Sequence, residues 1–364
     1  MGARPLRIER LTAHGFRNLA PLELSPGPHF NVVHGDNGAG KSNVLEAIHY
    51  LGSLRSFRGA RTDDLIELGG HRAVLEARVT GETAARTYRA ALERGKPRAL
   101  TLDGKRPRSI ASWHASIQMV LFHPGDVGLA GGPPEGRRAF LDRILEQLDP
   151  TYASTLAGYQ KALRSRNRLL RQDRVDRPAV QAYDGVLAAA GAIVGQTRAR
   201  LVPELAERTT AAFADVVGET LPLEVRYEPR VDPDPAAIRA ALGRAFDKDV
   251  ARGFTADGPH GDDLGLRVHR VSARHHASQG QQRAIVLALK VAELDVLTRR
   301  TNRVPLLLLD DVSSELDRSR NRRLFEVLAQ LGGQVFLTTT HPEFILLDRD
   351  RVDFRVEEGR IEPG

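Results

Sequence analysis

Residues 35–42 of the chain read Gly35-Asp36-Asn37-Gly38-Ala39-Gly40-Lys41-Ser42, the complete pattern G-x-x-x-x-G-K-[ST]. The apolar run 30–34 before it predicts a strand, and residues 42–54 after it show the spacing of a helix. In this setting the pattern binds phosphate, because backbone N–H groups and the helix dipole face the anion. A chance glycine-rich turn is the disfavoured alternative.

The residue types of this loop predict a nucleoside triphosphate and Mg²⁺ as cofactors. Lys41, also a predicted catalytic residue, is expected to reach the β- and γ-phosphates, and Ser42 is expected to ligate Mg²⁺. The predicted cofactor-binding residues of this segment are Gly35, Asp36, Asn37, Gly38, Ala39, Gly40, Lys41, Ser42 and Asn43.

A second apolar run, Leu306–Leu309, ends in the paired acids Asp310 and Asp311. An uninterrupted apolar run is typical of a parallel strand buried on both faces, and ligands bind at the carboxyl ends of such strands. We therefore expect Asp310 to hold Mg²⁺ and Asp311 to orient or deprotonate an attacking water. Without other motifs, an apolar strand that ends in acids is more often a plain core strand. The glycine loop in the same chain favours the ligand-binding interpretation instead.

The segment Ala277–Arg283 is a polar loop that precedes a helical pattern and predicts a second phosphate cradle. Ser278, Gly280 and Gln281 are its predicted nucleotide-binding residues, with Ser278 also a catalytic candidate. An ordinary helix N-cap is the alternative. Because Ser42 and Ser278 are 236 positions apart, we expect composite sites shared between subunits.

The order of the motifs predicts an α/β fold with an insertion. The first third is rich in short strand patterns, residues 137–213 have helical periodicity, and 221–270 contain one strand candidate among polar loops. From Ser278 onward the pattern alternates helix and apolar strand. We expect a discontinuous head at 1–128 and 271–364, with an N-terminal antiparallel β part and a largely helical lobe inserted at 129–270.

Composition narrows the class of protein further. The chain has 364 residues and no cysteine, which excludes disulfides, thiolate metal sites and a cysteine nucleophile. No apolar run approaches the roughly 18 residues that span a bilayer, and the N-terminus lacks a signal-peptide core. We expect a soluble cytoplasmic protein with no membrane partner.

The basic residues suggest a partner that carries phosphate. The formal net charge is +7, and only six of the 53 basic residues are lysines. Arginine suits phosphate because its planar fork donates two parallel hydrogen bonds. The spacing of four side chains puts them on one helical face and predicts DNA contact, against the alternative of a solvated face; they are Lys161, Arg164, Arg168 and Arg171. Arg55 and Arg58 are further candidates, either for DNA or for stabilising the head.

The motifs together resemble ABC-type ATPase heads, in which the same elements occur in this order. The stretch Ser313–Asp317 and the strand-end residue His341 belong to the resemblance. The chain is similar above all to the RecF family of bacterial recombination-repair proteins. The matching segments are 15–19, 41–48, 54–58, 136–142, 166–170, 258–264 and 278–294.

The resemblance implies an ATP-closed homodimer that binds double-stranded DNA near single-strand gaps. Ser278 and Gly280 would contact the γ-phosphate of the other subunit's nucleotide, and His341 would act as a switch histidine. RecR and RecO are implied as partners, with RecA loaded downstream. ABC transporters usually carry glutamate where this chain has Asp311, so we expect a weak, DNA-dependent ATPase. Either His123 or Gln118 takes the place of the usual glutamine-loop residue.

Three other functions each explain part of the sequence pattern. The nucleotide-binding subunit of an ABC transporter explains the ATPase motifs but neither their separation nor the basic helix. A structural chromosome protein of the SMC type needs hundreds of heptad residues, which the chain lacks. A nuclease needs a separate acidic metal cluster, and Asp262-Asp263 more simply forms a loop turn.

Overall fold

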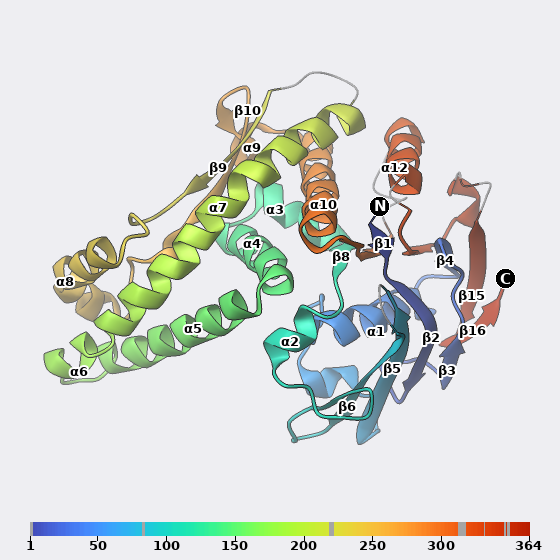
Figure 1. Ribbon diagram of the computed structural model, residues 1–364, viewed down its shortest axis with the longest axis horizontal. Coiled ribbons are helices and arrows are strands. Elements are labelled where there is room, and N and C mark those ends of the chain that lie inside the picture. The colour runs from blue at the N-terminus through green and yellow to red at the C-terminus, as the bar shows by residue number, and fades with distance from the viewer. Residues whose placement is uncertain are drawn as a thin grey trace. The chain divides into compact units, whose positions relative to one another are not determined.

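The structure is a computed structural model that describes residues 3–81, 84–217, 222–311, 318–330, 332–345, 347 and 350–364 (Figure 1). The chain divides into two units. The sheet unit comprises Met1–Asp126 and Glu293–Gly364 with the short segment Asp215–Gly218, and the helical unit comprises Val127–Ala214 and Glu219–Ala292. The stretch Ser313–Asp317, which contributes to the resemblance, lies outside the described residues.

A six-stranded sheet carries the two strands on which the sequence motifs lie. Its order is β16-β15-β4-β14-β13-β8, and all neighbours are parallel except β16, which pairs antiparallel with β15. The α/β fold class is thereby confirmed. The strands are β4 (Phe30–His34), β8 (Met119–Phe122), β13 (Leu306–Leu309), β14 (Val335–Thr339), β15 (Arg351–Glu357) and β16 (Arg360–Pro363).

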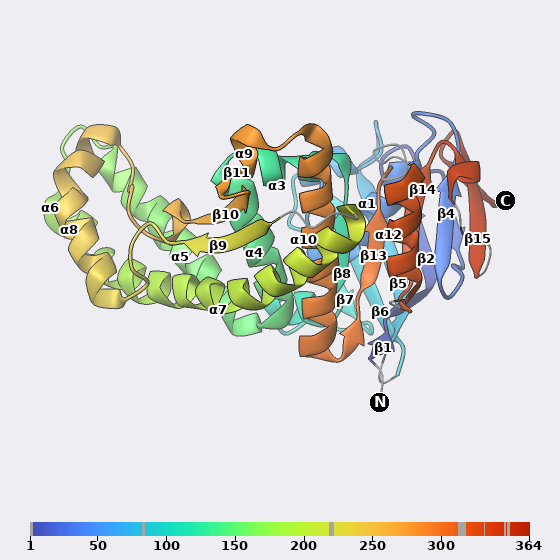
Figure 2. The same cartoon turned by 90° about the horizontal axis from the view of Figure 1, so that it is seen from above.

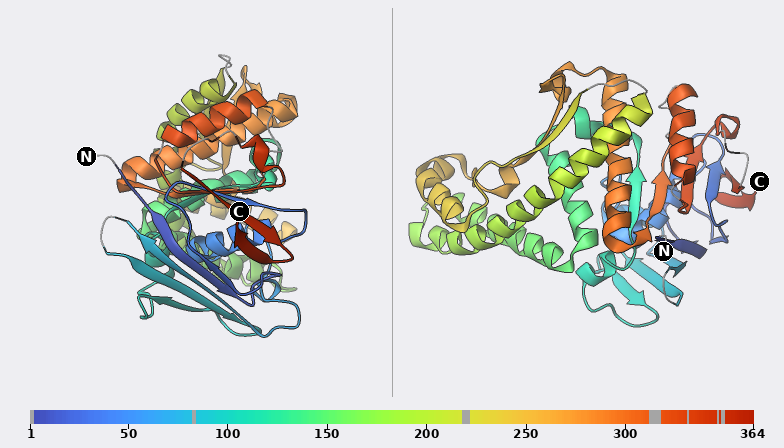
Figure 3. Two further views of the ribbon diagram at one scale, coloured as in Figure 1. Left: turned by 90° about the vertical axis from the view of Figure 1, so that its right-hand side faces the viewer. Right: turned by 45° about the horizontal axis from the view of Figure 1, so that its top comes forward.

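The predicted antiparallel part of the head is a five-stranded sheet in the order β3-β2-β5-β6-β7 (Figure 3). Asp103 and Gly104, at φ 53° and 75°, form the tight turn after β7. The strands are β2 (Arg7–His14), β3 (Leu22–Leu24), β5 (Arg72–Thr80), β6 (Arg86–Glu93) and β7 (Ala99–Leu102). β1 (Arg4–Pro5) pairs separately with β12 (Arg303–Val304).

Helix α1 (Lys41–Ser53) follows the glycine loop and contacts both sheets. Its residues from Val44 to Gly52 are buried, which is the burial expected of a helix enclosed on all sides. The helix ends at Leu54, whose φ of 55° is left-handed. This enclosure fixes the direction in which the glycine loop opens. The other helical segments of the sheet unit are η1 (Thr62–Leu65), α2 (Ile110–His114), η2 (Pro124–Val127), α12 (Arg318–Gln330) and η4 (Pro342–Phe344).

The helical unit is built mainly from long helices, as expected (Figure 2). A three-stranded antiparallel sheet, β11-β10-β9, accompanies them. The helices are α3 (Gly128–Gly131), α4 (Pro134–Leu148), α5 (Pro150–Leu170), α6 (Arg177–Gln181), α7 (Asp184–Val217), α8 (Pro235–Arg252), η3 (Pro259–Gly261), α9 (Ala273–His276) and α10 (Gln279–Thr301), and the division between the two units falls within α10. The strands are β9 (Leu223–Glu228), β10 (Asp263–Val268) and β11 (Val271–Ser272).

The prediction of polar loops beyond the strand candidate at 223–227 is wrong, because α8 and β10 lie there. The signals for α8 are present in the sequence. Asp234 caps the helix by accepting from the N–H of Ala237, Pro235 occupies its first turn, and Gly253 ends it at φ 72°. The buried side of α8 contains several alanines, so it differs little in hydrophobicity from the exposed side.

Buried arginines join the helices of the helical unit. Arg166, fully buried, donates to Asp184 on α7 at 3.0 Å and to Asp249 on α8 at 2.8 Å. Arg198 on α7 forms a two-pronged pair with Asp142 on α4, both contacts at 2.9 Å. Removing one partner would leave a buried unpaired charge, a change that typically costs about 3–5 kcal/mol.

His260 in the helical unit is held in one neutral tautomer. Nε2–H donates to the carbonyl of Thr255 at 2.9 Å, so Nδ1 accepts from the hydroxyl of Tyr159 at 2.6 Å. Burial lowers the pKa of His260 below its ordinary value of 6.5, and Arg138 adds to this effect. The carboxylates of Asp262 and Asp249 oppose it. The folded protein therefore resists protonation at this site.

We expect the free energy of unfolding to fall as pH is lowered through 6.5. Below that pH the unfolded chain binds the proton that folded His260 refuses, and one proton contributes at most about 1.4 kcal/mol per pH unit. His260→Gln should flatten the dependence in urea titrations followed by circular dichroism. Exposed His71→Gln is the matched control, and an unchanged slope in His260→Gln would refute this origin.

Candidate nucleotide-binding site

The glycine loop between β4 and α1 has a backbone that only glycine adopts easily. Gly35, Gly38 and Gly40 have φ values of 151°, 82° and 119°. A Cβ atom on Gly35 would lie 2.2 Å from the carbonyl oxygen of Val356, so a side chain is also excluded by contact. Strand, loop and helix follow one another as the sequence predicts, and the start of α1 faces the space above the carboxyl end of β4.

Lys41 is the first residue of α1, and its ammonium group is turned back onto the glycine loop. Nζ donates to the carbonyls of Gly35 at 2.8 Å and Asp36 at 2.9 Å. Burial lowers the pKa of Lys41, and the carboxylates of Asp311, Asp310 and Asp36 oppose that effect. Because β4, β14 and β13 are adjacent parallel strands, the glycine loop and the paired acids lie at the same carboxyl edge of the sheet.

The paired acids follow β13 and are fixed by one threonine on the neighbouring strand β14. The hydroxyl of Thr338 donates to Asp310 Oδ1 at 2.8 Å and accepts from the N–H of Asp311 at 2.9 Å. Thr338 is itself 1 % exposed. Asp311 has φ 50°, so the chain turns sharply after Asp310. Sequence reasoning missed Thr338, because nothing in an apolar strand pattern marks one hydroxyl as a support for the next strand.

The donor atoms at this edge of the sheet suit Mg²⁺. Ser42 offers a hydroxyl in the first turn of α1, and Asp310 offers a carboxylate. Mg²⁺ takes hard oxygen ligands, usually one or two carboxylates completed by phosphate and water. Within the described part of the chain no group of three or more histidine or acidic side chains forms a metal cluster of its own. The residues therefore fit an ion that is bound together with a nucleotide.

The sheet register separates the two glutamine-loop candidates. In the parallel pairing of β8 and β13, Phe122 lies opposite Leu309, so His123 follows β8 at the edge where Asp310 follows β13. The N–H of Asp310 donates to the carbonyl of Phe122 at 2.9 Å. Gln118 precedes β8 at the opposite edge. Of the two residues, His123 is the one that lies at the edge of the paired acids.

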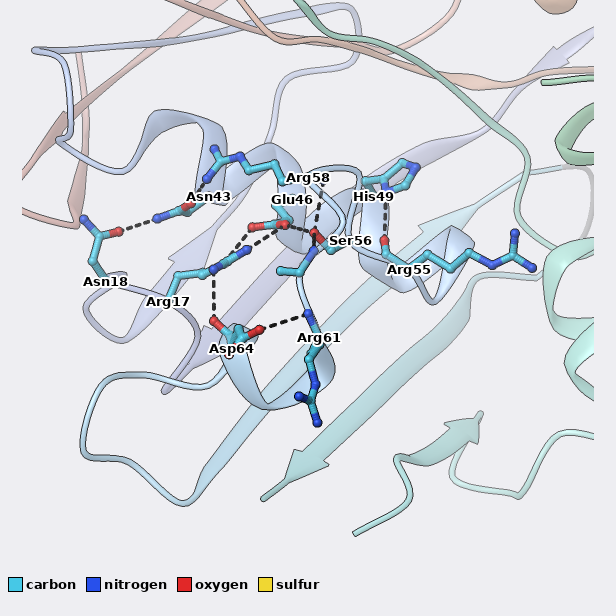
Figure 4. Close-up of polar contacts among 11 residues, drawn as sticks. Arg17, Asn18, Asn43, Glu46, His49, Arg55, Ser56, Arg58, Arg61 and Asp64 are labelled. Atoms are coloured by element: carbon cyan, nitrogen blue, oxygen red, sulfur yellow. Dashed lines mark hydrogen bonds and ion pairs between the residues drawn. The ribbon is translucent and has the colours of Figure 1, made fainter. Parts of the chain in front are cut away.

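A buried carboxylate joins α1 to the arginine loop, which we define as residues 54–61 (Figure 4). Glu46, in the middle of α1, is fully buried and accepts from Arg17 Nε and Nη2 at 2.9 and 3.1 Å. It also accepts from the hydroxyl of Ser56 at 2.5 Å. Ser56 in turn accepts from the N–H groups of Arg58 and Ala60. The carboxylate of Glu46 therefore holds the arginine loop against helix α1.

A second chain of contacts runs from the arginine loop back to the glycine loop (Figure 4). Arg58 donates to Asn43 Oδ1 at 2.8 Å, and Asn43 Nδ2 donates to Asn18 Oδ1 at 2.6 Å. Asn18 Nδ2 then reaches the carbonyl of Gly38 at 3.3 Å. Asn43, predicted to bind cofactor, is thus a support of the loop in this structure. The side chain of Arg55 points away from the cluster.

The second predicted phosphate cradle begins helix α10 in the helical unit. The hydroxyl of Ser278 accepts from the N–H of Gln281 at 3.2 Å, and Gln281 Oε1 accepts from the N–H of Ser278 at 2.9 Å. This reciprocal pair is a capping box, the alternative weighed for this segment. Ser278 is exposed and Gly280 partly exposed, so the cap leaves the loop open to solvent.

His341 follows β14 at the same sheet edge as the paired acids. Its side chain is 58 % exposed, and Nδ1 lies 3.1 Å from Glu343 Oε1. Its N–H donates to Thr339 Oγ1 at 3.0 Å. In this structure the imidazole is therefore held by a residue two positions further along the chain.

The basic side chains predicted for DNA lie on one exposed face along and just past α5. We call this set, Lys161, Arg164, Arg168 and Arg171, the basic face; all four are exposed. Arg171 Nε–H donates to the carbonyl of Gly253 at 3.1 Å. Leu156, Tyr159 and Leu170 are buried on the other side of the helix. Arg166, in the same basic run, faces inward and is structural.

These features define the class of protein. A glycine loop between β4 and α1, a strand with paired acids in the same parallel sheet, and an antiparallel sheet against the loop helix form an ABC-type ATPase head. None of the helices in the described ranges combines the length and apolar character needed to cross a membrane.

Comparison with known proteins identifies the family within this class. The family described as "RecF/RecN/SMC N terminal domain" matches residues 7–359. The "DNA replication and repair protein RecF" of Myxococcus xanthus is 40% identical over 346 residues, covering 92% of this chain and 91% of its own. The protein of the same name from an Anaeromyxobacter species is also 40% identical, covering 98% and 99%. The chain belongs to the RecF family.

A solved structure supports the same placement. The structure described as that of "the recombination mediator protein RecF-ATP in RecFOR pathway" matches with a TM-score of 0.91 and 26% identity. The match covers 100% of this chain and 99% of that one. The expected family and fold are therefore confirmed, and membership in this family leaves the transporter alternative without support.

Proposed function

We propose that this protein is an ATP-dependent DNA-binding protein of recombinational repair with weak, DNA-dependent ATPase activity. The observation that carries the proposal is that the glycine loop after β4 and the paired acids Asp310 and Asp311 after β13 lie at the same carboxyl edge of one parallel sheet. The proposed ATPase head comprises residues 1–128 and 271–364, and the inserted lobe comprises 129–270. Within this head, residues 271–292 belong to the helical unit of the structure. Relatives named for DNA replication and repair support the biological setting.

ATP binds with its phosphates against the N–H groups of the glycine loop. Lys41 shifts its hydrogen bonds from the loop carbonyls to the β- and γ-phosphate oxygens. Ser42 and Asp310 would hold Mg²⁺, which would offset phosphate charge. Asp311 orients the attacking water and takes up its proton. Aspartate is shorter than the glutamate usual at this position, so we propose slow turnover that works as a switch.

The ATP site is completed by a second copy of the chain. Ser278 and Gly280 of one subunit contact the γ-phosphate of the nucleotide held by the other, Gln281 belongs to the same nucleotide-binding loop, and ATP closes the homodimer. The exposure of this loop at the start of α10 supports the assignment. The capping pair uses the N–H groups of Ser278 and Gln281, and the other N–H groups in the first turn of a helix have no partner within the helix. His341 responds to the γ-phosphate by leaving Glu343.

The basic face of α5 binds the backbone of double-stranded DNA near single-strand gaps. Its exposed cations point away from the buried stripe of the same helix, as a surface that follows phosphates requires. Arg55 and Arg58 in the arginine loop contribute further contacts. RecR and RecO act as protein partners, and RecA is loaded downstream in the cytoplasm. A related structure is described as that of a recombination mediator protein in the RecFOR pathway, which supports the choice of RecR and RecO.

Reversing charge on the basic face tests the proposal. Arg164→Glu together with Arg168→Glu should weaken binding to gapped duplex by at least about tenfold and lower the slope of log K against log salt by about 2, since each contacted phosphate contributes about 0.9. Fluorescence anisotropy at several salt concentrations measures both quantities. ATP binding should be unchanged.

The matched control is Arg239→Glu together with Arg244→Glu, an equal charge change on exposed residues of α8. This control should retain most of the affinity and the full salt slope. If both double variants lose affinity equally, net charge rather than the basic face determines binding. If neither loses affinity, α5 does not contact DNA.

A further inference from the structure

The helical unit contains a polar pocket that the proposed ATP and DNA sites do not use. Its volume is about 240 Å³, and it is lined by α3, α4, β9, β10, β11 and α9. The side chains that decide its chemistry are Arg137, Glu228, Asp263, Arg267, Arg274 and His275. We infer that this pocket binds a phosphoryl group and thereby fixes the helix that leads into the loop of Ser278.

Both carboxylates of the pocket are neutralised by arginines within it. Arg137 donates to Asp263 with two prongs, at 2.7 and 2.8 Å, and also to the carbonyls of Leu129 and Gly132. Arg137 is 5% exposed, so this fork is a fixed part of the wall. Arg267 pairs with Glu228 at 2.8 Å. Neither acid is left to repel an anion.

The remaining charge is positive and comes from α9. Across the described residues, the guanidinium of Arg274 forms no ion pair, and its side chain is exposed at the pocket. The ring of His275 beside it lies next to that of His276, with ring centroids 6.5 Å apart. Three arginines against two carboxylates leave a net charge of +1 before any contribution from His275. The pocket therefore attracts an anion and holds it next to Arg274.

The size of the pocket selects a small anion. A water molecule takes about 30 Å³ of liquid, so the space corresponds to roughly eight waters. That is small beside the pockets of about 300–1,000 Å³ that hold drug-sized ligands, but it suits a phosphoryl group with its nearest substituents. The planar guanidinium of Arg274 matches phosphate geometry, and Ser272, which also lines the pocket, carries a hydroxyl. Free phosphate and the DNA backbone both present this group.

Occupation of the pocket would act on the loop of Ser278 through α9. The side-chain amide of Gln282, in the first turns of α10, donates to the carbonyls of Ala273 and Ala277 at 3.4 and 3.3 Å. A Cβ atom on Gly131 of α3 would lie 2.8 Å from Gln282 Oε1, so this side chain is closely enclosed. An anion that ties Arg274 to β10 restrains α9, and α9 restrains the start of α10.

Hydrogen exchange localises the effect without relying on ATPase activity. Sodium phosphate, against sodium chloride of equal ionic strength, should slow exchange of amides 271–282 by about threefold or more in protein saturated with ADP. Arg274→Ala should lose this protection. Arg270→Ala, an exposed arginine of the neighbouring β10–β11 turn, is the matched control and should keep it. Because phosphate bound at the glycine loop affects both variants equally, their difference reports the pocket alone.

Equal protection in both variants, or none in the native protein, would overturn the inference. A short duplex in place of phosphate then separates the sources of the phosphoryl group. If Arg274→Ala weakens duplex binding by about tenfold relative to Arg270→Ala, the ligand is a backbone phosphate. If duplex binding is equal while phosphate protection is lost, the ligand is a free phosphate. Both results are independent of whether ATP is hydrolysed.

Discussion

Lys41→Ala is expected to weaken ATP binding by about 100-fold. The ammonium group is buried and already donates two hydrogen bonds, which it can transfer to phosphate oxygens without reorganising the loop. Hydrogen bonds to charged groups contribute about 1.5–3 kcal/mol each, and about 1.4 kcal/mol corresponds to a factor of ten. ATP-dependent dimerisation should disappear with ATP binding. Titration with a fluorescent ATP analogue and sedimentation velocity measure the two effects.

The control for Lys41 is Lys105→Ala, which removes an exposed lysine of the same sheet unit from the turn after β7. It should bind ATP and dimerise as the native protein does. The thermal stability of Lys41→Ala should stay close to native, because the carbonyls of Gly35 and Asp36 are partly open to water. A dimer that persists with ATP in Lys41→Ala would contradict the composite site.

Asp311→Asn is expected to lower the rate of ATP hydrolysis by about 10²–10³-fold while ATP affinity changes less than about threefold. A positioned general base contributes roughly 10²–10⁴ to a rate, and asparagine cannot accept the proton. The backbone should be undisturbed, because Thr338 holds Asp311 through its N–H rather than its carboxylate. Asparagine also tolerates the φ of 50° at this position. The variant should therefore accumulate the ATP-bound dimer.

Single-turnover hydrolysis of radiolabelled ATP, with ATP affinity measured in parallel, separates catalysis from binding. Asp353→Asn is the matched control, since Asp353 pairs with Arg351 on β15, away from the paired acids. That control should hydrolyse ATP at the native rate. A native rate in Asp311→Asn would assign the water to another residue, and a large loss of ATP affinity would place Asp311 on the nucleotide instead.

The elements that carry short-range patterns were predictable from the sequence. The strand 30–34 and the apolar strand before Asp310 appear with little change, since a glycine loop and an uninterrupted apolar run each point to one local structure. The helix after the loop begins at Lys41, one residue before the predicted start. The basic face of α5 was predictable because residues three and four positions apart share one side of a helix.

The contacts that hold the site in place were not predictable in the same way. The bond between Glu46 and Arg17 joins residues 29 positions apart, and neither side chain breaks the pattern of its own element. Arg166 reads as one more member of a basic run, yet it is fully buried. The role of such charged residues depends on partners that are distant in the sequence. The local spacing of residues does not indicate these partners.

The buried pairs of Arg166 have a consequence for how the helical unit folds. One guanidinium of α5 needs carboxylates from α7 and α8 at the same time. An intermediate with two of these helices docked would enclose an unmatched charge, so its free energy would be high. Docking of α5, α7 and α8 is therefore cooperative, and the basic face of α5 is formed together with the core beneath it.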